Sequence, residues 1–275
     1  MYIREPFVAG RFYTRDRNEL SQQISGYINK ASDSAVGDIC AIIAPHAGYI
    51  YSGEVAACAY RQLVGREFDT VIVMAPSHYE RFDGISVIPE GLYRTPLGDM
   101  TIDAAFTREL MKSSDFTFIE NAHIPEHSLE VQIPFVQSVL PDATLVPLVL
   151  SNSSLDLMKR CGEAISKSIG LLKRKALLVI STDLSHFHDY DDALARDKKF
   201  ITTLESGDPQ LLKKVLDQGF ASACGEAPLL AGLYFAHARG SFKVRILKYA
   251  NSGDTSGERS RVVGYMAGAI ELLQG

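Results

Sequence analysis

The sequence has few cysteines, no surplus of basic residues and no long apolar run, and each absence excludes a class of protein. The four cysteines, Cys40, Cys58, Cys161 and Cys224, form no CxxC pair, which excludes a zinc ribbon and a disulfide framework. The 28 Lys and Arg residues are outnumbered by 33 Asp and Glu residues, so we expect no nucleic-acid partner. The apolar runs are far shorter than the roughly 20 residues of a membrane span, so we expect no membrane partner.

Nothing in the sequence divides the chain into parts. It has 275 residues, of which 46% are hydrophobic and 22% charged, as in ordinary globular proteins. It contains no internal repeat, low-complexity tract or Pro/Gly-rich linker, so we expect a single domain over residues 1–275. The first residues lack the apolar segment of a signal peptide, which predicts a cytoplasmic protein.

Apolar strand patterns alternate with helical patterns along the chain. This alternation predicts an α/β fold whose central sheet is mainly parallel and carries helices on both faces. A glycine-containing apolar run over residues 261–270 is interpreted as a further strand. Other strands are expected near residues 39–44, 70–75, 84–88, 144–150, 176–181 and 243–249. Helices are expected near residues 18–30, 53–64, 102–112, 127–139, 154–170, 191–205, 209–217 and 226–239.

Three of the apolar runs end in a few small or turn-forming residues and then a histidine. They lead to His46, His78 and His186. Continuous apolar runs are typical of strands buried on both faces, as in a parallel sheet. Parallel strands end at one edge of the sheet, and open α/β sheets bind ligands at that edge. The three histidines are therefore predicted to meet in one functional crevice.

The neighbours of these histidines indicate how each ring is presented. Glycine and alanine flank His46, which allows a sharp turn with an exposed ring; a histidine that merely caps a helix is the alternative. Tyr49, in the same turn, is a candidate substrate contact. Asp183 precedes His186 by three residues, and we expect its carboxylate to accept a hydrogen bond from that ring and raise its basicity.

A second histidine-rich segment contains His123 and His127. Their spacing suits a metal pair on a helix, but Pro125 is well placed as the first helical residue, which leaves His123 in the preceding loop. His127 and Glu130 then share one helix face and are candidate substrate-binding or supporting residues. Ordinary capping by an acidic helix start is the alternative.

Cys224 directly precedes the last predicted helix. A thiol at a helix N-terminus has a lowered pKa, so we expect a thiolate that acts as a metal ligand or a nucleophile. Two histidine nitrogens and one anionic ligand, with open coordination positions on the metal, are the arrangement of a catalytic metal site. In the alternative, Cys224 is a nucleophile with His186 as base and Asp183 as orienting residue, which leaves His46 and His78 without a role.

Several motifs occur in a fixed order along nearly the whole chain. They are Val8–Tyr13, Pro45–Tyr49, Ser77–His78, Glu126–Glu130, Ser181–His186, Ala223–Gly225 and Ser252–Asp254. In these motifs the chain resembles the Memo family, whose archaeal and bacterial members are called AmmeMemoRadiSam system protein B. That family is similar in fold to the class III extradiol dioxygenases, non-haem iron enzymes with a two-histidine, one-carboxylate site and a catalytic histidine.

The resemblance implies that His46 and His78 are metal ligands, with Cys224 in the carboxylate position. It implies that His186 is the catalytic histidine, with Asp183 beside it. Family members are linked to redox chemistry with iron or copper and, in eukaryotes, to phosphotyrosine-peptide binding and cell motility. An association with a radical-SAM protein in prokaryotes implies a shared pathway.

Three functions are compatible with these residues. The first is a metal-dependent oxidoreductase that uses one ion of iron or copper on a small-molecule or peptide substrate. The second is a zinc-dependent hydrolase with His186 as acid and base. The third is a non-catalytic module that binds a peptide or small ligand in the same crevice, since one fold supports many functions.

Overall fold

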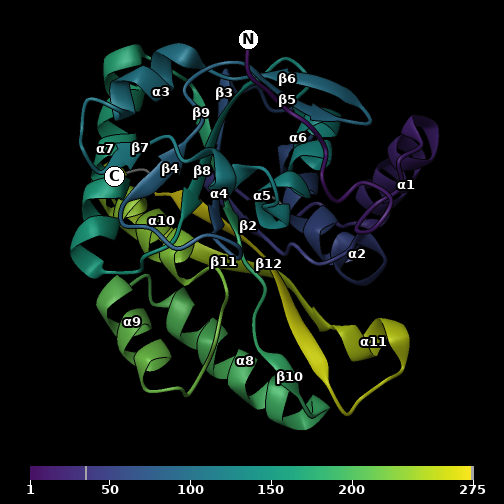
Figure 1. The fold of residues 1–275 in the computed structure, drawn as a ribbon. Coiled ribbons are helices and arrows are strands. Elements are labelled where there is room, and N and C mark those ends of the chain that lie inside the picture. Colours follow the sequence, from purple (N-terminus) through teal and green to yellow (C-terminus); the bar gives the residue numbers. More distant parts are fainter. Residues whose placement is uncertain (35, 274–275) are drawn as a thin grey trace.

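A nine-stranded mixed sheet forms the centre of the protein in a computed structural model that describes residues 1–34 and 36–273 (Figure 1). In sheet order its strands are β10 (His186–His188), β12 (Val262–Leu272), β2 (Asp38–Ala44), β9 (Ala176–Ser181), β3 (Thr70–Pro76), β8 (Thr144–Leu150), β4 (Ile85–Val87) and β7 (Phe116–Thr117). The remaining strand, β11 (Phe242–Asn251), pairs with β12.

The four middle strands, β2, β9, β3 and β8, run parallel to one another. Antiparallel strands flank them, with β12 beside β2 and β4 beside β8. The middle strands are almost entirely buried, because helices cover both faces of a parallel sheet. The predicted α/β fold with helices on both faces of the sheet is confirmed, and so is the strand predicted over residues 261–270. The sheet is mixed: parallel pairing is limited to the four middle strands and to β4 with β7.

Alternate side chains of β2 enter two apolar cores, one on each face of the sheet. Ile42 and Ala44 belong to one core, and Ala41 and Ile43 to the other. The first core is covered by α1 (Arg17–Lys30), α2 (Tyr49–Tyr60), α4 (Glu120–His123), α5 (His127–Glu130) and α6 (Ile133–Val139). The second is covered by α3 (Ala104–Leu110), α7 (Leu155–Leu172), α8 (Tyr190–Glu205), α9 (Pro209–Asp217) and α10 (Glu226–Arg239). Among the described helices none is long and apolar enough to cross a membrane.

Short elements account for most of what the sequence did not predict. A separate sheet joins β1 (Ile3–Arg4), β5 (Leu92–Thr95) and β6 (Gly98–Thr101). Further examples are η1 (Arg61–Leu63), which follows α2 directly, the strands β7 and β10, and α11 (Ser252–Ser256), between β11 and β12. Segments of two to five residues carry too little periodicity to be recognised.

The helix predicted over residues 127–139 is divided in two, which corrects the interpretation of this segment. Pro134 has no N–H to donate to the carbonyl of residue 130, so a continuous helix would lack this hydrogen bond. Pro125 does not begin a helix either; Glu126 caps α5 by accepting the N–H of Ser128. His123 ends α4 instead of lying in a loop, and its buried ring contacts Ser86 Oγ at 3.0 Å.

Candidate metal centre

The structure brings together two of the strand-end histidines and Cys224. One nitrogen from each ring of His46 and His78 and the sulfur of Cys224 lie within 4.8 Å of one another. The two ring centroids are 5.2 Å apart, and Cys224 Sγ is 3.0 Å from His46 Nε2. His46 follows β2, His78 follows β3, and Cys224 precedes α10, so three distant parts of the sequence meet at the carboxyl ends of the parallel strands.

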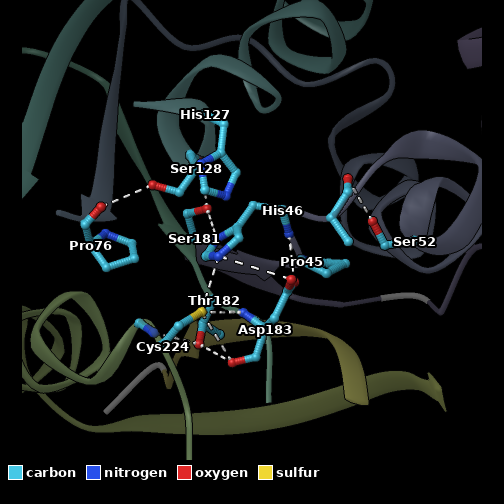
Figure 2. Close-up of polar contacts among 12 residues, drawn as sticks. Pro45, His46, Ser52, Pro76, His127, Ser128, Ser181, Thr182, Asp183 and Cys224 are labelled. Carbon is cyan, nitrogen blue, oxygen red and sulfur yellow. Dashed lines mark hydrogen bonds and ion pairs between the residues drawn. The ribbon is translucent and has the colours of Figure 1, made fainter. Parts of the chain in front are cut away.

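His46 is buried, with 2% of its surface exposed. Its Nδ1 contacts Ser181 Oγ at 2.8 Å, and its Nε2 faces Cys224 (Figure 2). Burial, together with the neighbouring rings of His78 and His127, holds the pKa of His46 well below its ordinary value of 6.5. The ring is therefore neutral at physiological pH, as a metal ligand must be.

His78 is supported by the carboxylate of Glu126. The Nδ1 of His78 is 2.9 Å from Glu126 Oε1. Burial alone would raise the pKa of Glu126, but hydrogen bonds from His78 and Ser128 outweigh it and lower that pKa. An ionised carboxylate only accepts hydrogen bonds, so Nδ1 carries the proton, and in the neutral ring the lone pair of Nε2 is free to bind a metal ion. This is the usual carboxylate–histidine support of a metal ligand.

Cys224 is held by the backbone around Asp183. The N–H of Asp183 donates to Cys224 Sγ at 3.1 Å, and the N–H of Cys224 donates to the Asp183 carbonyl at 3.2 Å. The close packing requires glycine next to it, because a Cβ on Gly225 would lie 2.4 Å from the carbonyl oxygen of Ser181.

The predicted lowering of the Cys224 pKa is wrong. Burial, with the nearby negative charge of Asp183, raises the pKa of this thiol, and hydrogen bonds from the backbone do not compensate. Helix α10 begins at Glu226, after its N-cap Gly225, so Cys224 lies outside the first helical turn. A bound cation reverses this balance, because a coordinating thiol loses its proton outright.

Asp183 supports His46 instead of His186, which corrects the predicted pairing. Its Oδ1 accepts the backbone N–H of His46 at 2.7 Å, and its Oδ2 is 4.0 Å from His46 Nε2. The ring of His186 donates from Nδ1 to the Leu184 carbonyl at 2.7 Å. Burial raises the pKa of Asp183 to about 7, so this carboxyl group exchanges a proton near neutral pH.

His186 lies on β10, at an irregularity in its pairing with β12. The next residue, Phe187, has a φ of 63°, a conformation that is costly for a bulky residue and often occurs at functional sites. Because a carbonyl accepts the Nδ1 proton, Nε2 of His186 is a free acceptor. Burial lowers the pKa of His186, and the nearby His78 lowers it further, so the ring is available as a neutral base.

The three predicted substrate contacts occupy different positions. The ring of His127 is 4.6 Å from that of His78 and 5.6 Å from that of His46, so it belongs to the cluster. Tyr49 is buried and donates to the Val131 carbonyl at 2.6 Å. Glu130 is fully buried.

Glu130 anchors the N-terminal segment. Its carboxylate is paired with the guanidinium of Arg4, accepts the Tyr13 hydroxyl at 2.6 Å and accepts the backbone N–H groups of Phe7 and Val8. All of these partners come from the first residues of the chain. The carboxylate thus ties the start of the chain to α5.

The polar residues behind the cluster were not singled out from the sequence. They are Glu126, Ser128, Gln132 and Ser181. The available signal was weak: each is a polar residue within an otherwise apolar segment or at a helix start. A supporting residue of this kind is recognised by the burial of its polar side chain. Burial can be seen only in the folded structure.

A sequence model described as Memo-like protein matches residues 4–269 of the chain. The chain belongs to the Memo-like family. It is 36% identical to a MEMO1 family protein of Aeropyrum pernix, over 97% of this chain and 99% of that relative. It is 35% identical to a MEMO1 family protein of Methanothermobacter thermautotrophicus, over 96% of this chain and 98% of that relative.

A solved structure shares the fold of this Memo-like chain. The crystal structure of uncharacterized protein JW3007 from Escherichia coli K12 superposes with a TM-score of 0.53, covering 84% of this chain and 99% of that one. The sequence identity is 14%, so the likeness concerns the fold alone.

Proposed function

We propose that this Memo-like protein is a metal-dependent oxidoreductase whose metal ion is held by His46, His78 and Cys224. The observation that carries the proposal is the convergence of two imidazole nitrogens and one thiol sulfur within 4.8 Å of one another. Three protein ligands with further positions open to substrate are typical of catalytic metal sites.

The surroundings of the three donors fit a metal ion. Each imidazole has one nitrogen engaged by a supporting residue, Ser181 for His46 and Glu126 for His78. Burial makes the thiolate form of Cys224 unfavourable unless a positive charge lies nearby. A bound cation would supply that charge.

The proposed ion is iron or copper. Imidazole suits both metals, and a thiolate is a strong electron donor. When bound, such an ion supplies electron-transfer chemistry. The resemblance in fold to class III extradiol dioxygenases favours this redox function over zinc-dependent hydrolysis with the same ligands.

Two further residues near the cluster, His186 and Asp183, have roles in proton transfer. The free Nε2 of His186 accepts a proton, because its Nδ1 is occupied by the Leu184 carbonyl. Asp183 holds a proton near neutral pH. The cluster is exposed to solvent at His78, whose side chain is 30% accessible. A small molecule or peptide would approach the cluster there.

Elemental analysis of protein purified without oxygen tests the proposal, with wild type compared with Cys224→Ala. Cys58→Ala is the matched control, because Cys58 is also partly buried but lies on α2, where its thiol donates to Glu54. We expect about one iron or copper per chain in the wild type and the control, and a loss in Cys224→Ala. Zinc lost in the same way would favour the hydrolase. No metal after reconstitution would overturn the metal centre and favour the binding module.

A further inference from the structure

The ring of His46 lies between two contacts that bear on which nitrogen carries its proton. Nδ1 is 2.8 Å from Ser181 Oγ and Nε2 is 3.0 Å from Cys224 Sγ. A neutral imidazole has one N–H, and which nitrogen carries it follows from the hydrogen bonds around the ring. The contacts of Nε2 do not decide which nitrogen carries the proton, because a thiol both donates and accepts and Asp183 Oδ2, at 4.0 Å, is beyond hydrogen-bond distance. The contact of Nδ1 with Ser181 decides it.

The amide of Gln132 has a fixed orientation. Its Nε2 is 3.0 Å from the carbonyl oxygen of Pro45, which only accepts hydrogen bonds. The same Nε2 is 2.9 Å from Ser181 Oγ, and the Tyr60 hydroxyl donates to Oε1 at 2.9 Å. The reverse orientation would place two carbonyl oxygens together. Gln132 therefore donates to Ser181.

The single hydroxyl proton of Ser181 is also assigned. Ser181 Oγ is 2.7 Å from the backbone carbonyl of Ser128, and a carbonyl oxygen has no proton to give. Ser181 consequently donates to Ser128 and accepts from Gln132. A hydroxyl oxygen has one proton and two acceptor positions, so its one remaining position accepts a proton from His46.

We propose that Ser181 is a positioning residue that holds His46 as its Nδ1–H tautomer, so that the lone pair of Nε2 points at Cys224. The inference deepens the proposed function, on which its metal-binding consequence rests. Ser181, Ser128 and Gln132 are each at most 1% exposed, so water does not compete for these hydrogen bonds. Figure 2 shows Ser181 and Ser128 on one side of the His46 ring and Cys224 on the other.

Ser128 connects this arrangement to the second histidine. Its hydroxyl oxygen lies 2.7 Å from Glu126 Oε1 and 3.0 Å from the Pro76 carbonyl oxygen, and its one proton is shared between these two acceptors, while its own carbonyl accepts from Ser181. Glu126 in turn accepts Nδ1–H of His78. Glu126 and Ser128, at the start of α5, thus support both rings, His78 directly and His46 through Ser181.

Nitrogen-15 NMR of the histidine rings tests the proposal in metal-free protein at neutral pH. We expect His46 to show Nδ1–H and an unprotonated Nε2 in the wild type. An Nε2–H tautomer of His46 in the wild type would overturn the proposal, and this reading requires no variant and no metal. Absence of metal binding by the wild type would instead count against the proposed function and leave the tautomer result standing.

Ser181→Ala removes the acceptor and tests its role directly. We expect the tautomer of His46 to shift towards Nε2–H and the affinity for added metal to fall about 10- to 100-fold. Val179→Ala, at another fully buried position of β9, controls for lost packing: it should lower the melting temperature without changing the tautomer. An unchanged tautomer in Ser181→Ala would show that Ser181 does not hold it.

Discussion

Glu126 holds His78 at two points: its Oε2 accepts the backbone N–H at 2.7 Å, and its Oε1 faces the ring Nδ1 at 2.9 Å. The position and the tautomer of the ring thus depend on one carboxylate. This partner is ionised, whereas the corresponding partner of His46 is the neutral hydroxyl of Ser181. His78 is therefore the more electron-rich of the two proposed ligands.

The substitution Glu126→Gln should weaken metal binding while the protein stays folded. Glutamine keeps the shape of the side chain but removes the charge that makes His78 a stronger donor. We expect an affinity about 10- to 100-fold lower, measured by competition with a chelator. Glu163→Gln is the matched control, because Glu163 is exposed on α7. Equal affinities in the two variants would show that the carboxylate does not tune the ligand.

Asp183 should make the metal-free protein less stable as the pH rises from about 4 to 7. Its pKa is raised from 3.8 to about 7 by burial, so below pH 4 the group is protonated in both the folded and the unfolded state. Between these values the unfolded chain loses the proton and the folded protein keeps it, which favours unfolding. A difference of about three pKa units corresponds to roughly 4 kcal/mol.

Asp183→Asn isolates this contribution because asparagine does not ionise. Urea unfolding of both metal-free proteins at several pH values gives the difference in their free energies of unfolding. We expect the difference to move in favour of the variant between pH 4 and 7 and to level off above pH 7. A difference that stays constant over this range would contradict the raised pKa.

Gly225→Ala should displace Cys224 and reduce metal binding. An added Cβ would lie 2.4 Å from both the Ser181 carbonyl oxygen and the Cβ of Thr182, so the segment must shift. Gly170→Ala is the control, because nothing lies within 4 Å of a Cβ at that position in α7. It should stabilise the helix by up to about 1 kcal/mol. Metal content equal to that of wild type in both variants would show that the close packing at Gly225 does not set the position of the thiol.

The sheet and the strand-end histidines were predictable because they depend on local pattern and one rule of topology. Apolar runs before His46 and His78 identify buried strands, and parallel strands end at a common edge. Strand β8 has the predicted bounds, residues 144 to 150. The side chains that these strand ends deliver could therefore be placed together without any knowledge of tertiary contacts.

The electrostatics and partners of the site could not be read from sequence spacing. Asp183 is three residues from His186, yet the chain turns so that its carboxylate meets the backbone of His46. The thiol of Cys224 precedes a helix, yet burial determines its pKa. Both outcomes depend on distant segments that surround these groups in the folded protein, and the hydrogen bond that Asp183 accepts from His46 spans 137 residues.

The strand that leads to His46 has β9 on one side and β12 on the other. During synthesis on the ribosome, β2 emerges early, but its edge stays unpaired until residues 262–272 have been made. An unpaired apolar edge promotes association with other chains. Chains released before β12 is made would therefore expose this edge of β2 to other chains and be prone to aggregate.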